Sequence, residues 1–134
     1  MNTRRLNIGI RTRVERTRSL REVVRRAAHD GRKRQGTELY FENVDELRRV
    51  LTEKRMELLL AIGHDRPASI QQLAGLVGRD YKNVSTDIAL LERLGLVSLT
   101  ARGGRGKPQR PKVPYDEICV TIDLRRPSET HAAQ

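Results

Sequence analysis

The segment 69-SIQQLAGLVGRDYKNVSTDIALLERLGLV-97 decides the fold, because it holds two short helices with their own start and stop signals. Ser69 followed by Gln72 is a capping-box pattern, which predicts a helix that ends at Gly78. Asp80 predicts the cap of a second helix that ends at Gly95 and has one apolar face. The segment therefore predicts two helices joined by a tight glycine turn.

Two more helices are predicted on the N-terminal side of this segment. Asn43 opens another capping box, which predicts a short helix through Leu51. Thr52 predicts the cap of a helix over Glu53–Ile62, and Gly63 is expected to end it.

On the C-terminal side the apolar period changes from that of a helix to that of a strand. Leu96–Ala101 predicts one strand, and Val113–Tyr115 predicts its return as an edge strand. The cleanest alternation runs over Ile118–Leu124 and predicts a third strand.

The first 35 residues predict a basic arm made of a strand and a helix. Leu6–Ile10 alternates as a half-buried strand does, and Val14–Ala28 carries one apolar helical stripe. Asp30–Gly36 is polar and predicts a linker. We expect the arm to serve dimerisation or partner binding, its strand joining Ile118–Leu124 in one sheet. That sheet forms either across a homodimer or within one chain.

The order helix, helix, glycine turn, helix, strand, basic loop, strand is that of a winged helix-turn-helix. The predicted fold class is therefore α+β, mostly α, with the arm over residues 1–35 and the winged domain over 36–125. Residues 126–134 are expected to be a disordered tail. Because specific operators usually contain two half-sites, a homodimer is expected.

The positive charge is concentrated in two places, which favours an anionic partner. The chain has a formal net charge of +10, of which residues 1–35 carry +9 and residues 102–112 carry +5, while the other segments are slightly acidic. The basic residues of the predicted wing loop are Arg102, Arg105, Lys107, Arg110 and Lys112.

A major groove admits one α-helix, so the polar face of the second helix is the candidate reading surface. Its members and the residues flanking them are Arg79, Tyr81, Lys82, Ser85, Thr86 and Arg93. Lys82, Ser85 and Thr86 are expected to contact bases, and Arg79 and Tyr81 to contact phosphates. Ser69 and Gln71 begin the bracing helix, whose N-terminus either receives a phosphate or is simply capped. An ordinary solvated face is the alternative for the second helix, and the adjacent basic loop favours DNA binding.

Several stretches together resemble a family of small MarR-like winged-helix regulators over about residues 39–124. They are 51-LTEKRMELL-59, Ser69-Ile, Leu73-Ala, 78-GRDYKNV-84, Asp87, 91-LERLGLV-97 and 113-VPYDEI-118. The resemblance implies a transcriptional repressor, in many members the autoregulating antitoxin of a toxin–antitoxin pair with a cognate toxin as partner. The wing is longer and more basic here than in that family. A regulator without a toxin is the alternative.

An enzyme is not expected, because the three histidines have no cysteine or carboxylate at metal-ligand spacing and the single Cys119 has no nearby base. No catalytic residue, metal or cofactor is therefore predicted. A lone cysteine and the lack of a long apolar run predict a cytoplasmic protein, nucleoid-associated when bound to DNA, without membrane contact. An organellar transit peptide is the alternative reading of the arm. An RNA-binding or protein-interaction module is the functional alternative, and few aromatic residues are present for base stacking.

Overall fold

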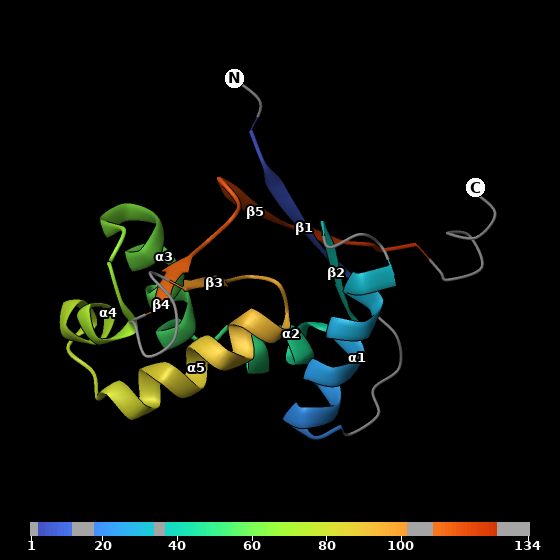
Figure 1. The fold of residues 1–134 in the computed structure, drawn as a ribbon. Coiled ribbons are helices and arrows are strands. Elements are labelled where there is room, and N and C mark those ends of the chain that lie inside the picture. Colours follow the sequence, from blue (N-terminus) through green and yellow to red (C-terminus); the bar gives the residue numbers. More distant parts are fainter. Residues whose placement is uncertain (1–2, 12–17, 34–36, 102–108, 126–134) are drawn as a thin grey trace.

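The computed structural model describes residues 3–11, 18–33, 37–101 and 109–125, which form an α+β fold that is mostly helical (Figure 1). The elements of these residues are β1 (Arg5–Ile10), α1 (Leu20–Lys33), β2 (Glu38–Phe41), α2 (Val44–Val50), α3 (Glu53–Asp65), α4 (Ile70–Val77), α5 (Tyr81–Arg93), β3 (Ser98–Ala101), β4 (Gln109–Lys112) and β5 (Glu117–Ile122). Among the described residues, no helix is both long and apolar enough to cross a membrane.

The N-terminal strand lies in the middle of a three-stranded parallel sheet with the order β2-β1-β5. All three strands belong to the same chain, so the pairing expected between Leu6–Ile10 and Ile118–Leu124 forms within one chain. The connection from β1 to β2 runs through α1, as parallel neighbours require a crossover. Leu6, Ile8 and Ile10 are buried on one face of β1.

One hydrophobic core joins the sheet to the helices. Leu6 and Ile8 belong to the same buried cluster as the α1 stripe and as the apolar faces of α3, α4 and α5. The buried stripe of α1 comprises Val23, Val24 and Ala27. Residues from both sides of the predicted boundary at residue 35 therefore share one sheet and one core.

The helix starts at α2, α3, α4 and α5 are confirmed by their caps. The side chains of Asn43, Thr52 and Ser69 accept the backbone N–H three residues ahead, and Asp80 accepts from Lys82. Gly78 is left-handed (φ 67°) at the end of α4, where a side chain would be strained. The cap signals are local, so the sequence alone carries them.

The predicted end of α3 at Gly63 is wrong, because the helix continues to Asp65. Its cap is Arg66, which adopts a left-handed conformation with φ 49°. Pro67 follows, and a proline disfavours the helical conformation of the residue before it. The proline, not the glycine, therefore ends this helix.

The arm helix and one strand also differ from expectation. The arm helix begins at Leu20 and extends into the predicted linker as far as Lys33, while residues 14–17 of its predicted span lie outside the described residues. In this extension Asp30 accepts from Arg26 one turn earlier, at 3.3 Å. Strand β2 was not expected, because four residues are too short to show a period.

The return strand of the hairpin is Gln109–Lys112, not Val113–Tyr115. Pro111 pairs opposite Leu99 in this strand and is buried. Within the described residues the strand has β3 as its one neighbour, so it is an edge strand there, and an edge tolerates proline.

Candidate functional site

Helix α5 has one buried face and one open face. Val84, Ile88 and Leu91 are fully buried, while Lys82, Thr86, Ala89 and Arg93 are exposed on the other side. The spacing of these four residues places them in one line along the helix. Tyr81, at the start of the helix, is 52% exposed. The sequence-predicted polar side of this helix is therefore open to solvent over its whole length.

Two hydroxyl residues of this face differ in what they can offer a ligand. Thr86 donates its hydroxyl proton to the backbone oxygen of Lys82, at 2.9 Å. Its oxygen keeps lone pairs, so Thr86 can act as an acceptor towards a base or a phosphate. Ser85 is half-buried, so it is less accessible than Lys82 and Thr86.

Helix α4 packs against α5 and is joined to it by a short turn over residues 78–80. Ser69 Oγ accepts the backbone N–H of Gln72 at 3.0 Å, so this hydroxyl caps the helix. Gln71, the other residue predicted at this helix start, is exposed. The capping alternative for Ser69 is thus present in the structure.

Arg79 lies in an ion-pair cluster instead of presenting a free guanidinium. Its Nη2 donates to Asp87 Oδ2 at 2.9 Å, and only 17% of its side chain is exposed. Arg55 of α3 donates from Nε to the other oxygen of Asp87, at 3.0 Å. Asp87 therefore connects α3, the α4–α5 turn and α5.

Sequence reasoning missed this cluster, because residue types alone do not show which charged side chains the fold brings together. Asp87 is the one acidic residue between the cap and Glu92 of α5, while Arg55 precedes it in α3 and Arg79 in the α4–α5 turn. Arg55 also donates to the backbone oxygens of Arg49 and Val50, both at 2.9 Å. The cluster fixes the orientation of α5 relative to α3.

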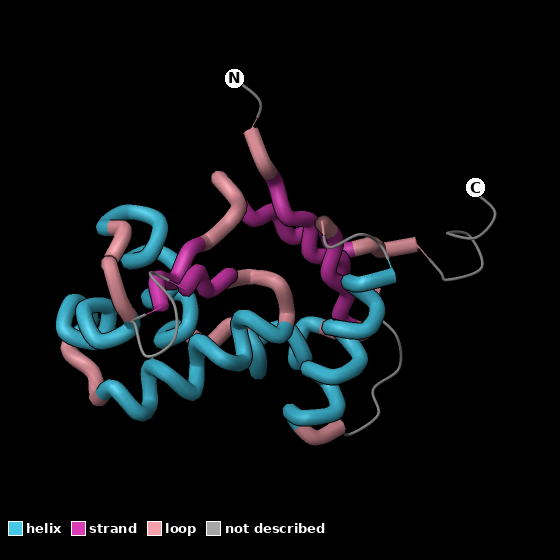
Figure 2. The backbone as a smooth tube through the Cα atoms, viewed as in Figure 1, coloured by secondary structure: helices cyan, strands magenta, loops and turns pink. Residues whose placement is uncertain are grey.

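The hairpin of β3 and β4 stands beside α3 and α4 (Figure 2). The strands are antiparallel, and Ala101 pairs opposite Gln109, where the described part of the hairpin ends. Lys112 is exposed and Arg110 is half-buried. The other three predicted wing residues, Arg102, Arg105 and Lys107, lie outside the described residues. The pairing of β3 with β4 therefore places Ala101 and Gln109, which flank residues 102–108 in the sequence, opposite each other.

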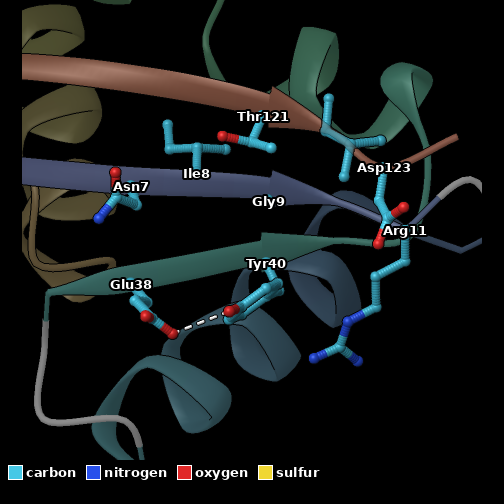
Figure 3. Close-up of a pocket in the computed structure, with 9 residues that line it drawn as sticks. Asn7, Ile8, Gly9, Arg11, Glu38, Tyr40, Thr121 and Asp123 are labelled. Atoms are coloured by element: carbon cyan, nitrogen blue, oxygen red, sulfur yellow. Dashed lines mark hydrogen bonds between the residues drawn. The ribbon is translucent and has the colours of Figure 1, made fainter. Parts of the chain in front are cut away.

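A shallow cavity of about 270 Å³ lies on the sheet face that α1 does not cover (Figure 3). Tyr40 lies flat over Gly9, where a Cβ atom would be only 2.6 Å from the ring. The Tyr40 hydroxyl donates to Glu38 at 2.8 Å, and the Arg11 guanidinium is 4.6 Å from the ring centre. The Tyr40 hydroxyl and the Glu38 carboxylate already bind each other, so the cavity is a weaker candidate than the open face of α5.

The basic residues of α1 divide into paired and exposed ones. Arg26 donates to Glu46 at 2.6 Å and to the backbone oxygen of Tyr40 at 3.1 Å. Arg21 and Arg25 are exposed. Among the described residues, no group of three or more histidine, cysteine or acidic side chains could hold a metal ion.

The comparisons with known proteins give one family. The HVO_A0114 family model matches residues 50–120, which run from the end of α2 into β5 and make up more than half of the chain. No curated protein and no solved structure matches the chain. The matched span contains α3, α4, α5 and the hairpin.

Proposed function

The chain belongs to the HVO_A0114 family, and we propose that it is a DNA-binding protein with a winged helix-turn-helix formed by α3–α5 and the β3–β4 hairpin. In this proposal the protein is a dimeric transcriptional repressor that recognises a specific operator, and it has no catalytic activity. The antitoxin role depends on the sequence resemblance alone, so the tests below address DNA binding.

The observation that carries the proposal is the open face of α5. A helix that enters a major groove needs one side free along its length and a second helix that braces it. The exposed line of Lys82, Thr86, Ala89 and Arg93 supplies the first, and α4 supplies the second. Lys82 lies one residue from the helix start, which is the part of a recognition helix that contacts base edges.

The proposed roles follow from exposure. Lys82 and Thr86 contact bases, and the half-buried Ser85 is less accessible to them. Tyr81 and Arg93 contact phosphates. Arg79 is reassigned from phosphate contact to positioning, because Asp87 holds its guanidinium. The basic segment that β3 and β4 enclose contacts the phosphate backbone beside the groove, together with Lys112.

An electrophoretic mobility shift on the DNA upstream of the protein's own gene, at several salt concentrations, tests the proposal. We expect Lys82→Ala to weaken binding about 10-fold and to change the preference between sequences, because a base contact contributes about 1–3 kcal/mol of discrimination. We expect Lys112→Ala to weaken binding to all sequences alike and to reduce the salt slope by about 0.9.

The matched control is Lys54→Ala, which removes an exposed lysine of α3 outside the open face. Equal binding by the Lys82 and Lys54 variants would exclude α5 as the reading helix. If the protein bound every duplex with equal affinity and the Lys112 variant left the salt slope unchanged, the assignment of Lys82 to bases and Lys112 to phosphates would be excluded.

A further inference from the structure

Strand β5 forms one edge of the parallel sheet and carries an uncovered apolar row. Its register with β1 places Ile118, Val120 and Ile122 opposite Leu6, Ile8 and Ile10, on the face that packs into the core. Ile118 is partly buried against that core, but Val120 is 47% exposed and Ile122 is 49% exposed. Figure 3 shows β5 on the side of β1 opposite β2.

Leu124 continues the row two residues beyond Ile122 and is 88% exposed. An edge strand with exposed apolar side chains is a template for pairing with another chain, and proteins usually protect such an edge with charges, proline or a covering element. Here the apolar row stays open beside a covered core. The edge of β5 is therefore expected to pair with a strand of another chain.

The backbone of β5 has hydrogen-bonding groups available at the same residues. The N–H of Asp123 donates to Ile10 at 3.1 Å, and the N–H of Glu117 donates to Arg4 at 3.3 Å. The backbone groups of successive residues point to opposite sides of a strand. The N–H and C=O groups of the odd-numbered residues of β5 therefore point towards β1. The N–H and C=O groups of Ile118, Val120 and Ile122 therefore face outward from the sheet.

We propose that a second copy of this chain pairs antiparallel along β5, with the two-fold axis at Thr121. Val120 then lies opposite the partner's Ile122, and Ile118 opposite the partner's Leu124. Glu117 lies opposite Arg125 of the partner subunit. Within one chain Glu117 already pairs with Arg5 at 2.5 Å and Arg125 with Asp123 at 3.0 Å, so the cross-strand contact joins these pairs into one charge network at each end of the ladder.

The charges favour this register over the neighbouring one. A two-fold axis at Val120 would place Glu117 opposite Asp123 of the partner subunit, and like charges in that position are destabilising. In the proposed register the acidic start and the basic end of one segment complement each other, which is a property of two identical strands. The result is a continuous sheet with the order β2-β1-β5-β5-β1-β2, in which the two apolar rows cover each other between the α1 helices.

This inference names the partner that the proposed function requires, and it rests on that function for the statement that two copies act together on DNA. The association itself is measured without DNA, by sedimentation equilibrium. We expect the wild-type chain to have twice the mass of one chain and Ile122→Lys to have the mass of one. The matched control is Leu60→Lys, which adds the same charge at an α3 residue that is 53% exposed. We expect it to remain dimeric.

A cysteine at the proposed axis tests the register without disturbing the apolar row. In a Cys119→Ser background, Thr121→Cys should form a disulfide-linked dimer under mild oxidation. The Thr121 pair is of the non-hydrogen-bonded kind, with Cα atoms about 4.5 Å apart, within the range that a disulfide spans. Glu57→Cys in the same background is the control, since Glu57 is exposed on α3.

Any of three results would overturn the β5 interface. The first is a monomeric wild-type chain, and the second is a dimer that Ile122→Lys leaves intact with an unchanged far-ultraviolet circular dichroism spectrum. The third is equal cross-linking of the two cysteine variants. A chain that is monomeric yet binds its operator overturns this inference and the dimeric part of the proposed function, and leaves DNA binding by α5 in place. A cross-linked dimer that binds no duplex supports the β5 interface and overturns the proposed DNA binding.

Discussion

Replacement of Asp87 by alanine should destabilise the protein by about 3 kcal/mol, because it leaves two guanidinium groups with little water and no counter-charge. Asp87 accepts from Arg55 and Arg79 on different oxygens, at 3.0 and 2.9 Å. The side chains of the three residues are only 14–17% exposed.

The magnitude follows from what each arginine keeps. Breaking a buried ion pair by removing one partner costs about 3–5 kcal/mol, and the low end applies here because the cluster is partly exposed. Arg55 retains its bonds to the backbone oxygens of Arg49 and Val50. Arg79 loses its carboxylate, and its Nη1 is already buried without a hydrogen-bond partner. Most of the loss should therefore arise at Arg79.

Urea denaturation followed by circular dichroism measures the effect as a change in the free energy of unfolding. The control is Asp45→Ala, which removes a 3.8 Å pair with Arg49 whose side chains are 61% and 42% exposed. An exposed pair of this kind should contribute less than about 0.5 kcal/mol. Equal stabilities of the two variants would refute the reasoning that the Asp87 cluster is desolvated.

A double-mutant cycle locates the interaction within the cluster. Adding Arg79→Met to Asp87→Ala should recover part of the lost stability, because it removes the unpaired charge. Adding Arg55→Met should recover less, because that arginine also holds the end of α2. Equal coupling energies in the two cycles would contradict the asymmetry seen in the hydrogen bonds.

Three other predictions concern local features. Gly78→Ala should destabilise the protein by about 1 kcal/mol because φ is 67°, whereas Gly75→Ala, inside the exposed side of α4, should stabilise it by about 0.5–1 kcal/mol; thermal unfolding of both variants shows the signs, and equal signs would contradict the cap geometry. Ser69→Ala should cost about 1 kcal/mol in the same assay through loss of the N-cap, and an unchanged midpoint would mean that the cap is dispensable. Burial raises the pKa of Tyr115, an effect that nearby Arg4 opposes. The folded state then keeps a proton that the unfolded chain loses near pH 10, so the free energy of unfolding should fall as the pH rises from about 10. Tyr115→Phe should remove a component that ionises above pH 10 from an absorbance titration of the tyrosines, and an unaltered titration would refute the assignment.

The helices could be predicted from the sequence because their signals lie within a few residues of each other. The caps at Asn43, Thr52, Ser69 and Asp80 all involve a side chain and an N–H no more than three residues away. The apolar spacing of α5 similarly predicted its buried and open faces.

The sheet and the ion-pair cluster could not be predicted in the same way. Strand β2 has four residues, and its pairing depends on β1, which is about 30 residues earlier in the chain. The hairpin was misplaced because Val113–Tyr115 looks more strand-like than a segment containing Pro111, and the pairing with β3 decides the outcome. Arg79 has the residue type and position of a phosphate contact, and only the spatial position of Asp87 shows its actual partner.

The pairing of β1 with β5 also constrains how the chain folds during synthesis. Contacts such as Arg5 with Glu117 span 112 residues, so β1 acquires one of its two neighbours only after all the intervening residues have been synthesised. The helices α2–α5 have local caps and lie between these strands, so they can form while β1 waits. Closing so large a loop is entropically costly and slow, so completion of the sheet should follow formation of the helices α2–α5.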